Sequence, residues 1–385
     1  MNEIKLLAQE HGTPLILYSN NEFLKSYKAF QKYLPKVKHH YSLKPLPMKE
    51  CIDAVADCNG YIDIASIGEL ELLKASNPKM ISKCIFTHPI KTEADIETLI
   101  SHGITIMVVE NLVELKKFEK HAKYISLLIR LAFPNEEALC NLSEKFGADE
   151  EKFKKLLVHA QKHSINIIGC CFHVGSQMLH PEKFVSSIKK CRKLYDWAYE
   201  NHGITFKVLD IGGGFPAQFD IGIMSLKEFC KPIKQVLDKL FPKVEIWSEP
   251  GRSVAANSMM VITKVIGKSY KKNHVWYYLD DGAYNTFSGL LFENMKYPLH
   301  TFDKTTEKPL LSVFAGPTCD SVDILDKDIV FQHLNVGDFL FAKRIGAYGW
   351  STRTSFNLLS APKIVCYDFD LNQIERFIAE NEKAL

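Results

Sequence analysis

The chain has 385 residues, of which 46% are hydrophobic and 24% are charged, and its formal net charge is +3. This length is enough for two domains, and the near balance of 48 basic and 45 acidic residues gives no indication of a nucleic-acid or anionic membrane partner. No apolar run reaches the about 18 residues that a transmembrane helix needs, and the first residues lack the apolar core of a signal peptide, so we expect no membrane-spanning segment.

The ten cysteines include no Cys-x-x-Cys pair, and several lie inside apolar runs such as Ile168–Phe172. We interpret them as reduced, buried residues of a cytoplasmic protein. Because no Cys/His ligand spacing recurs along the chain, we expect no metal site.

The first part of the chain predicts a helix over residues 1–12, a strand at Leu15–Ser19 and a helix that Asn20 caps. From residue 37, strand and helix patterns alternate. The expected strands are 37–43, 60–65, 84–87, 104–109, 125–132, 165–173, 206–211 and 244–248. The expected helices are 48–57, 66–76, 92–102, 111–122, 148–163, 181–202 and 225–240. Eight such βα units favour a closed (β/α)8 TIM-like barrel, with an open doubly wound sheet as the alternative.

After about residue 255 the long helices give way to short strand patterns separated by Gly, Pro, Asp and Asn. This pattern predicts a C-terminal β domain, either a barrel or a sandwich. Its expected strands are 258–266, 275–279, 310–314, 339–342 and 363–367, followed by a helix over 371–384. The expected organisation is an N-terminal segment 1–19 whose strand joins the β domain, a barrel over 20–254, and a β domain over 255–385.

Polar residues gather where the expected barrel strands end, which is where barrels of this kind carry their active sites. They are Lys44, Asp63, His88, Arg130, His173, Gly212–Gly214 and Glu249. Lys44 follows a strand that Pro45 and Pro47 would stop. On its own this lysine would be interpreted as an ordinary solvated side chain. Only the other polar residues at the strand ends favour a catalytic role for it.

Two loops at successive strand ends have the composition of a phosphate site. Asp210–Pro216 contains three consecutive glycines, which let the backbone turn tightly and aim N–H groups at an anion, although a plain flexible turn would look the same. Ser248–Arg252 places a carboxylate three residues before an arginine, which could be a surface ion pair or a guanidinium for a phosphate. The phosphate commonly lies at the last two strands of such barrels, which favours the second interpretation.

Two further motifs have a structural and a chemical interpretation. His173, within Phe172–Ser176, is either a satisfied core histidine or an imidazole suited to stack on a planar cofactor. Cys319 and Asp320, within Gly316–Asp323, form either a simple turn or an exposed thiol acid beside a carboxylate that holds a cation.

A lysine for a Schiff base, a glycine-rich loop with an arginine for a phosphate, and a carboxylate for a ring nitrogen together suit pyridoxal phosphate. The chain resembles the fold type III pyridoxal-phosphate decarboxylases, particularly the eukaryotic-type ornithine decarboxylase branch and its arginine-preferring relatives. This resemblance implies an alanine racemase-like fold. It rests on motifs found in the same order at Tyr41–Pro45, Asp63–Ser66, Glu144–Ala148, Phe172–Ser176, Asp210–Pro216, Glu249–Arg252, Asp281–Tyr284, Gly316–Asp320 and Thr354–Asn357.

The resemblance implies that Lys44 forms the Schiff base, that Glu249 pairs with the pyridine nitrogen, and that His173 stacks on the ring. Related racemases carry an arginine in place of this carboxylate, so Glu249 argues for decarboxylation. A carboxylate keeps the ring cationic and hence a strong electron sink. The other implied cofactor-binding residues are Asp63, Arg130, Ser176, Gly212, Gly213, Gly214, Arg252 and Tyr348.

The resemblance also implies a two-fold homodimer in which the barrel of each subunit meets the β domain of the other, so that two active sites are shared. Cys319 would return a proton to the substrate carbon after CO2 loss, and Asp320 would hold the distal cation of the substrate. Tyr284 and Phe356 are implied to line the same pocket, and Lys145 and Asp323 match a pair that bridges subunits.

The implied substrate is a basic L-amino acid, first ornithine, which gives putrescine for polyamine biosynthesis, with arginine or lysine as alternatives. Glu293 stands where ornithine decarboxylases carry aspartate, and here the chain resembles the arginine-preferring viral relatives. The extra methylene would shorten the pocket by roughly 1.5 Å if the backbone stayed in place. Two acids, Glu293 and Asp320, still favour a basic tail over the distal carboxylate of diaminopimelate.

Two other functions compete with decarboxylation. A catalytically inactive homologue that regulates a partner, as antizyme inhibitors do, would tend to lose cofactor residues, whereas here Lys44, His173, Glu249, Arg252 and Cys319 are all present. An amino-acid racemase on the same barrel is disfavoured by Glu249 and by the Cys-Asp motif.

Overall fold

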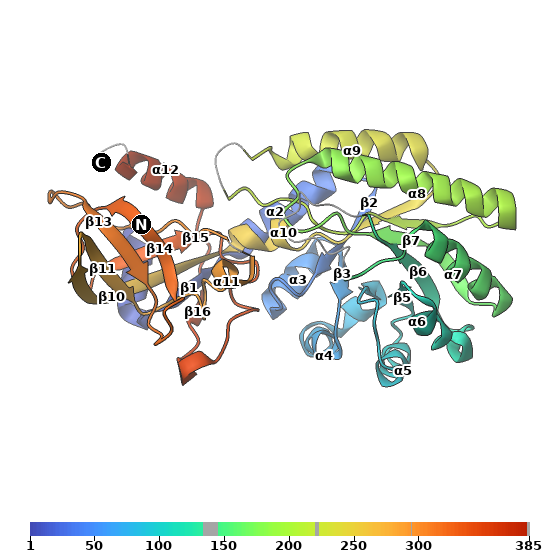
Figure 1. Ribbon diagram of the computed structural model, residues 1–385, viewed down its shortest axis with the longest axis horizontal. Helices are drawn as coiled ribbons and strands as arrows, with labels where there is room; N and C mark the ends of the chain where they lie inside the picture. Colours follow the sequence, from blue (N-terminus) through green and yellow to red (C-terminus); the bar gives the residue numbers. More distant parts are fainter. Residues whose placement is uncertain (134–144, 220–222, 294, 383–385) are drawn as a thin grey trace. The chain divides into compact units, whose positions relative to one another are not determined.

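The computed structural model describes residues 1–133, 145–219, 223–293 and 295–382 (Figure 1). The chain divides into two compact units. Leu24–Val254 form one, called the barrel unit below, and Met1–Phe23 together with Ala255–Leu385 form the other, called the β unit.

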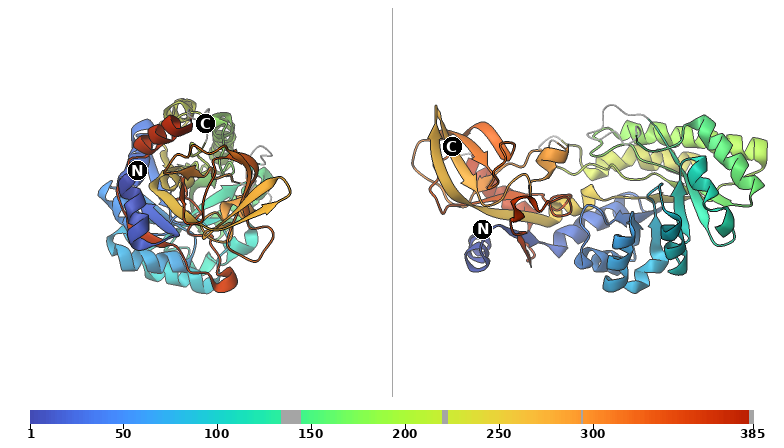
Figure 2. Two further views of the ribbon diagram at one scale, coloured as in Figure 1. Left: turned by 90° about the vertical axis from the view of Figure 1, so that its left-hand side faces the viewer. Right: turned by 60° about the horizontal axis from the view of Figure 1, so that its bottom comes forward.

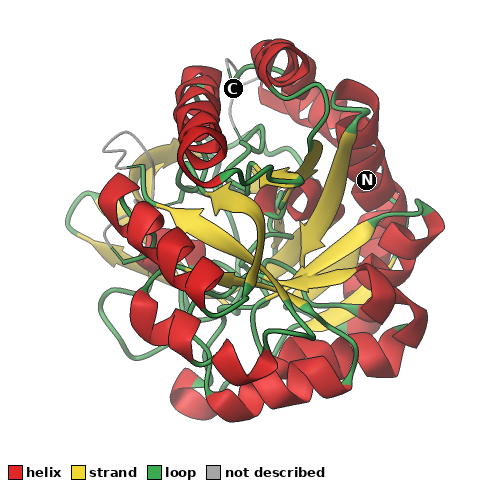
Figure 3. Ribbon diagram, turned by 90° about the vertical axis from the view of Figure 1, so that its right-hand side faces the viewer, coloured by secondary structure: helices red, strands yellow, loops and turns green. Residues whose placement is uncertain are grey.

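Eight parallel strands close into a ring in the barrel unit (Figures 1 and 3). In order around the ring they are β2 (Val37–Ser42), β3 (Tyr61–Ile64), β4 (Cys84–Phe86), β5 (Ile106–Val109), β6 (Ser126–Leu131), β7 (Asn166–Phe172), β8 (Val208–Asp210) and β9 (Glu245–Ser248). β9 pairs with β2, with Ile246 opposite Val37, which completes the ring. The predicted closed barrel is confirmed, and the open sheet is wrong.

Helices surround these strands, as the red ribbons outside the yellow strands show in Figure 3. They are α2 (Asn20–Tyr33), α3 (Lys49–Asp57), α4 (Ile67–Ser76), α5 (Glu93–Ser101), α6 (Leu112–Lys116), α7 (Glu150–Lys162), α8 (Pro181–His202), α9 (Leu226–Leu240) and α10 (Arg252–Ala255), with the short 3₁₀ helices η1 (Pro78–Lys83) and η2 (Glu119–His121). The 3₁₀ helix η4 (Ala256–Ser258) follows α10 and belongs to the β unit. Six strands each contribute a side chain to one buried cluster, formed by Ile85, Val108, Leu128, Cys171, Val208 and Trp247. Such alternating inward residues make the barrel a packed core.

The single helix expected over 111–122 is wrong, because the segment is two short helices. Asn111 caps α6 by accepting the N–H of Glu114 at 2.9 Å. After α6 the backbone hydrogen bonds connect residues three apart. The N–H of Phe118 donates to the carbonyl of Leu115 at 3.0 Å, and the 3₁₀ helix η2 follows. Phe118 is fully buried at this break, so packing of one aromatic ring overrides the helical pattern.

The cap of α2 is Ser19 and not Asn20 as expected. The Ser19 hydroxyl accepts the N–H of Glu22 at 3.2 Å, and its carbonyl accepts the N–H of Phe23. Both residues are good N-caps, and the structure uses Ser19, which directly follows β1.

The β unit is built on an eight-stranded, mostly antiparallel sheet, drawn largely in orange in the left view of Figure 2. Its strands are β1 (Leu15–Tyr18), β10 (Met259–Lys271), β11 (His274–Leu279), β12 (His300–Thr301), β13 (Leu310–Ala315), β14 (Ile324–Phe331), β15 (Phe339–Lys343) and β16 (Lys363–Cys366). β1 lies between β10 and β16, so the N-terminal strand belongs to this sheet. Its helices are α1 (Asn2–His11), α11 (Gly289–Glu293) and α12 (Leu371–Glu382), with the 3₁₀ helix η5 (Phe356–Leu358).

Two strands of this sheet have no counterpart among the predicted ones. β12 has only two residues, and β14 contains Asp326, Lys327 and Asp328, whose charges interrupt the apolar alternation that indicates a strand. β14 pairs with β13, and its first residue follows the Cys319 turn directly.

A close approach between β7 and β8 requires glycine at position 169. A Cβ atom built there would lie 1.8 Å from the carbonyl oxygen of Val208. Gly169→Ala must therefore force the two strands apart, and we expect it to lower the free energy of unfolding by roughly 1–3 kcal/mol or more. Urea denaturation of the variant measures this loss.

Gly267 in β10 provides the matched control for that substitution. A Cβ atom there would meet Tyr278 at an ordinary 3.5 Å. Gly267→Ala should leave the stability nearly unchanged, and equal losses for the two variants would contradict the steric explanation.

None of the helices in the described ranges combines the length and apolar character needed to cross a bilayer. Nine cysteines lie in those ranges, all as free thiols. The expectation of burial is confirmed for six of them and wrong for Cys366, which is exposed, and for Cys58, which is partly exposed. Cys140 lies outside the described residues.

Candidate active site

Lys44 lies on a tight turn that follows β2. The N–H of Leu46 binds the carbonyl of Leu43 at 3.0 Å, and the Tyr41 hydroxyl donates to the Leu46 carbonyl at 3.2 Å. Leu43 and Leu46 are fully buried, whereas 43% of the Lys44 side chain is exposed. The turn is thus anchored on both sides of a lysine that remains accessible.

Pro45, directly after this lysine, packs against the loop that follows β9. A Cβ atom built on Gly251 would lie 2.8 Å from Pro45 Cγ, so the ring of the proline touches the glycine. Ser42 N–H also binds the carbonyl of Pro250 at 3.3 Å. The proline therefore fixes the distance between the Lys44 turn and the segment that carries Glu249.

Asp63 connects three neighbouring strand ends. Its carboxylate accepts hydrogen bonds from Ser42 Oγ at 2.7 Å and from Thr87 Oγ1 at 2.6 Å, and it lies 3.6 Å from Lys44 Nζ. Only 1% of Asp63 is exposed. Because the two hydroxyls hold both oxygens, the carboxylate has a fixed position beside the lysine.

Glu249 and Asp210 form a coupled pair of carboxyl groups at the ends of β9 and β8. Asp210 is fully buried, accepts the N–H of Gly212 at 2.8 Å, and has its pKa raised to about 6 by burial. Burial, together with the charges of Asp210 and Asp63, raises the pKa of Glu249 well above its usual range. The two side chains share a hydrogen bond, and the raised pKa values of both mean that this site disfavours two carboxylate charges unless a cation lies beside them.

His173 follows β7 and has a defined tautomer. Its Nδ1 accepts the N–H of Gly175 at 2.9 Å, which leaves the proton of the neutral ring on Nε2. Burial, reinforced by the charges of Arg130 and Lys44, lowers the pKa of His173 well below its usual value. The imidazole is therefore neutral at physiological pH.

Arg130 comes from β6 on the same end of the barrel. Its guanidinium lies 5.1 Å from the centre of the Phe146 ring, and Lys145 Nζ lies 4.9 Å from that ring. His88, after β4, packs edge-on against the same phenylalanine. The aromatic ring thus holds cations at this rim of the barrel.

The glycine loop after β8 is a backbone cradle without room for side chains. Gly212 and Gly214 have φ angles of 65° and 99°, which L-residues rarely adopt. A Cβ atom on Gly213 would lie 2.7 Å from Glu249 O and 3.1 Å from His173 Nε2. The loop is therefore pressed against the carboxylate segment and the imidazole.

Ser176 and Arg252 stand in the two loops that flank this cradle. Ser176 is half-buried in the loop after β7, and Arg252, 6% exposed, begins α10 directly after Gly251. Gly214 O accepts the N–H of Met178, which ties the Ser176 loop to the glycine loop at 2.9 Å.

The β unit gathers a second group of predicted residues around the Cys319 turn. Tyr284 donates a hydrogen bond to the Asp320 carboxylate and stacks on Phe356, with ring centres 4.6 Å apart. The tyrosine hydrogen bond lowers the pKa of Asp320. Asn357 accepts the N–H of Cys319 at 3.1 Å and donates to its sulfur at 3.4 Å. Cys319 itself is exposed, as predicted.

Asp323 holds this turn from inside the β unit. Its carboxylate accepts the N–H of Ala283 at 2.7 Å and both the N–H and hydroxyl of Thr318, at 3.0 and 2.7 Å. Only 2% of Asp323 is exposed, and Gly282 and Gly316 leave room for it. Its observed role is to anchor the loop, and the bridge to Lys145 stays a prediction.

Two predicted residues lie in other segments of the β unit. Tyr348 is half-buried in the loop after β15, with φ 65°, and its carbonyl accepts the Ser288 hydroxyl at 3.2 Å. Glu293 is the last residue of α11 and is half-buried.

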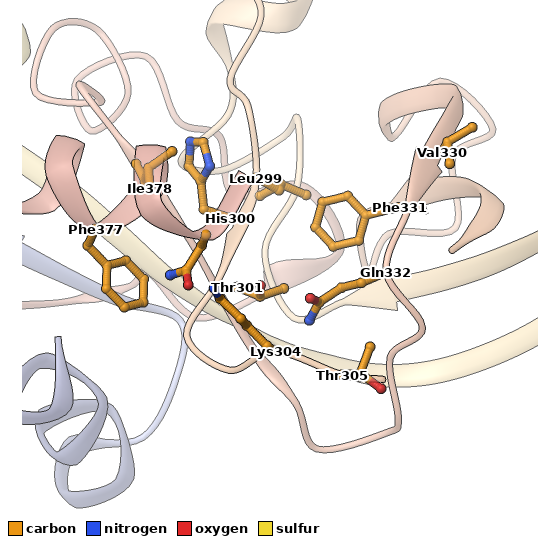
Figure 4. A pocket seen from close by; sticks show the side chains of 11 residues that line it. Leu299, His300, Thr301, Lys304, Thr305, Val330, Phe331, Gln332, Phe377 and Ile378 are labelled. Carbon is orange, nitrogen blue, oxygen red and sulfur yellow. The ribbon is translucent and has the colours of Figure 1, made fainter. Parts of the chain in front are cut away.

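A cavity of about 230 Å³ in the β unit does not include the predicted residues. Phe331, the last residue of β14, and Gln332, which follows it, lie on one side, and Phe377 and Ile378 from α12 lie on the other (Figure 4). Within the described ranges, none of the candidate catalytic or cofactor residues lines it. Its lining offers no nucleophile matched to a carboxylate, so we assign the chemistry to the strand-end residues of the barrel.

The strand-end residues of the barrel fit pyridoxal phosphate. The glycine loop turns with φ angles of 65° at Gly212 and 99° at Gly214, and such turns suit backbone N–H groups aimed at a phosphate. Three carboxyl groups, Asp63, Asp210 and Glu249, lie there, and a cationic pyridine ring would balance them. Lys44 is accessible beside Asp63 as a covalent attachment requires.

Sequence reasoning missed four residues that the geometry brings to these sites: Ser42, Thr87, Asp210 and Asn357. Three of them lie inside or beside motifs already recognised, since Ser42 precedes Leu43 and Lys44, Asp210 opens the glycine loop, and Asn357 follows Phe356. That proximity is the signal that could have found them. Thr87 directly precedes His88 at the end of a predicted strand, and the pairing of β3 with β4 brings it to Asp63.

Comparison with known proteins agrees with this geometry. The model of the pyridoxal-dependent decarboxylase family, pyridoxal binding domain, matches residues 20–256. A lysine/ornithine decarboxylase of Selenomonas ruminantium is 33% identical over 95% of this chain and 93% of its own length. Ornithine decarboxylase of Mus musculus is 30% identical over 89% of this chain and 78% of its own.

Solved structures extend the similarity over both units. The lysine/ornithine decarboxylase of Vibrio vulnificus, complexed with cadaverine, has a TM-score of 0.90 and 35% identity, covering 96% of this chain and 98% of that one. The chain therefore belongs to the pyridoxal-dependent decarboxylases and is an enzyme whose cofactor is pyridoxal phosphate.

Proposed function

We propose that the enzyme decarboxylates a basic L-amino acid, with ornithine as the first candidate, and so supplies putrescine for polyamine biosynthesis. The observation that carries this proposal is the Asp320 carboxylate, which Tyr284 orients beside the exposed Cys319 thiol and keeps ionised. An oriented anion next to a proton donor suits a substrate with a distal ammonium group. A cytoplasmic location, expected from the cysteine pattern, belongs to the same proposal.

The barrel residues hold the cofactor in this proposal. Lys44 binds it covalently, Glu249 keeps the ring nitrogen protonated, and neutral His173 supports the face of the ring. The phosphate is held by Ser176, the backbone of Gly212–Gly214, Arg252 and Tyr348, while Asp63 and Arg130 line the pocket. Bound pyridoxal phosphate supplies the electron sink for the electron pair left by CO2 loss.

Cys319 and Asp320 act on the substrate in the partner subunit's site. In this two-fold homodimer, Asp320 binds the distal cation, and Cys319 delivers a proton to the carbon that lost CO2. Asn357 holds the sulfur, and Tyr284 and Phe356 shape the pocket. The exposed thiol on a turn that Asp323 makes rigid supports this arrangement.

Lysine is the second candidate substrate. It is favoured by the similarity to two proteins named lysine/ornithine decarboxylase, one of them solved with cadaverine. The Asp320 carboxylate can bind the distal ammonium group of ornithine or of lysine if the pocket is long enough for the lysine side chain.

The experiment that tests the proposal measures CO2 release from ornithine, lysine, arginine and diaminopimelate by the enzyme reconstituted with pyridoxal phosphate. We expect release from ornithine, lysine or both, and little from diaminopimelate. Bound cofactor without CO2 release from any basic substrate would favour an inactive regulatory homologue, and a racemic amino-acid product would favour a racemase.

Glu293→Asp tests the side chain proposed to set the pocket length. Removing one methylene should lengthen the pocket by roughly 1.5 Å and shift kcat/KM by about 10-fold among the basic substrates. The same panel of four substrates measures the shift, with Glu307→Asp, an exposed acid of the same unit, as the control. An unchanged preference would remove Glu293 from this role.

A further inference from the structure

A cluster of two imidazoles and one carboxylate lies at the end of the barrel opposite the candidate active site. Glu119 belongs to η2, which precedes β6, and His159 and His163 belong to the last turn and the C-cap of α7, which precedes β7. Both segments lead into strand N-termini, whereas Lys44, His173 and Glu249 follow strand C-termini.

The three side chains already point their ligand atoms at one another. His159 Nε2 lies 2.8 Å from Glu119 Oε1, and His163 Nδ1 lies 3.5 Å from Glu119 Oε2. One ligand atom from each residue lies within 4.8 Å of the other two. Ligand atoms in a tetrahedral site with bonds of about 2.0–2.1 Å are about 3.3 Å apart, so these distances need only small adjustments.

The two histidines are arranged as a pair on one helix face. They are four residues apart, and their rings are stacked with centres 4.3 Å apart and planes 19° apart. The exposed fractions of the side chains are 17% for His159, 32% for His163 and 35% for Glu119. The cluster is therefore partly buried, which orders it, and still open to an ion from solvent.

We propose that Glu119, His159 and His163 form a binding site for one divalent transition-metal ion of the zinc class, with at least one coordination position left for water. Two imidazoles and a carboxylate are ligands that suit Zn²⁺, Co²⁺, Ni²⁺ or Cu²⁺, while Mg²⁺ and Ca²⁺ prefer all-oxygen sites. The bound ion ties η2 to α7 across the outer layer of the barrel.

From the sequence we expected no metal, although His159 and His163 have the i, i+4 spacing of a ligand pair on a helix. The ligands of this site come from segments 40 residues apart, and the break between α6 and η2, which the sequence did not predict, places Glu119. The His274–Asp328 ion pair at 2.6 Å offers a useful contrast in the β unit, because it has one imidazole and one carboxylate but no second imidazole.

Titration of the complete, cofactor-loaded enzyme with Co²⁺, followed by calorimetry and visible absorbance, tests the proposal. We expect one ion per chain with the ligand-field spectrum of nitrogen and oxygen ligands. His159→Ala, His163→Ala and Glu119→Gln should each weaken Co²⁺ binding at least about 10-fold, whereas His274→Ala should leave it unchanged. Decarboxylation should stay at the wild-type rate in these variants.

The melting temperature is a second readout, which separates loss of metal binding from loss of folding in the variants. Saturating Zn²⁺ should raise the melting temperature of the wild type and of His274→Ala but not that of the three ligand variants, because an ion bound only to the folded state stabilises it. Equal Co²⁺ affinity in wild type and ligand variants, or thiolate charge-transfer bands that assign the ion to Cys319 or Cys366, would overturn the site.

Discussion

Lys44→Ala should reduce decarboxylation by about 10⁴-fold or more, because the substitution removes the amine that binds the cofactor covalently. The fold should persist, since Ser42 and Thr87 still hold Asp63 and the flanking Leu43 and Leu46 keep the turn buried. Absorbance spectra should show loss of the band of lysine-bound pyridoxal phosphate, and CO2 release measures the activity.

Lys49→Ala is the matched control for that experiment. Lys49 lies five residues after Lys44, in α3, where it is exposed and forms an ion pair with Asp53. Its loss should change neither the absorbance band nor the rate. An Lys44→Ala enzyme that retained the band and most of the activity would refute the assignment of the covalent lysine.

Glu249→Gln should lower kcat by about 10²–10³-fold while the protein remains folded. The amide keeps the shape of the side chain and can still donate a hydrogen bond to Asp210, so the packing of the pair is preserved. It cannot act as a carboxylate toward the ring nitrogen, so the electron sink weakens. Steady-state kinetics should show the loss mainly in kcat and little change in KM.

Glu245→Gln on the same strand separates this chemical effect from a general effect of removing an acid. Glu245 begins β9 and pairs at the surface with Lys38 at 2.6 Å. We expect wild-type kinetics for this control. If Glu249→Gln retained the full kcat, the role of a carboxylate at the cofactor would be wrong.

The barrel could be predicted because its signals are local. Eight apolar strands alternate with seven predicted helices, and this repeated alternation leaves few arrangements other than a closed parallel ring. Lys44, His173 and Glu249 were identifiable for the same reason, since their positions along the chain coincide with the ends of β2, β7 and β9.

Features that depend on distant contacts could not be predicted. Burial of Phe118 breaks a regular helical pattern, and the charges of β14 hide a strand that only its pairing with β13 stabilises. The hydrogen bond from Asn357 to Cys319 joins residues 38 apart in sequence. In each case tertiary packing overrides the local pattern.

The proline that follows the lysine gains an explanation from the structure. From the sequence we expected Pro45 only to end the strand before Lys44, and in the structure its ring touches Gly251, between Glu249 and Arg252. Pro45 therefore packs the turn that carries Lys44 against the loop that carries Glu249 and Arg252. A rigid ring at this position suits the accurate placement that catalysis needs.

The central claim is that barrel residues of one subunit and the Cys319 turn of its partner complete each active site. The most direct test mixes Lys44→Ala with Cys319→Ala, each of which we expect to be nearly inactive alone, after verified subunit exchange through differently tagged chains. Random mixing makes half of the dimers mixed, each with one intact site, so we predict recovery of about a quarter of the wild-type activity. Mixed dimers that form and remain inactive would contradict the shared site.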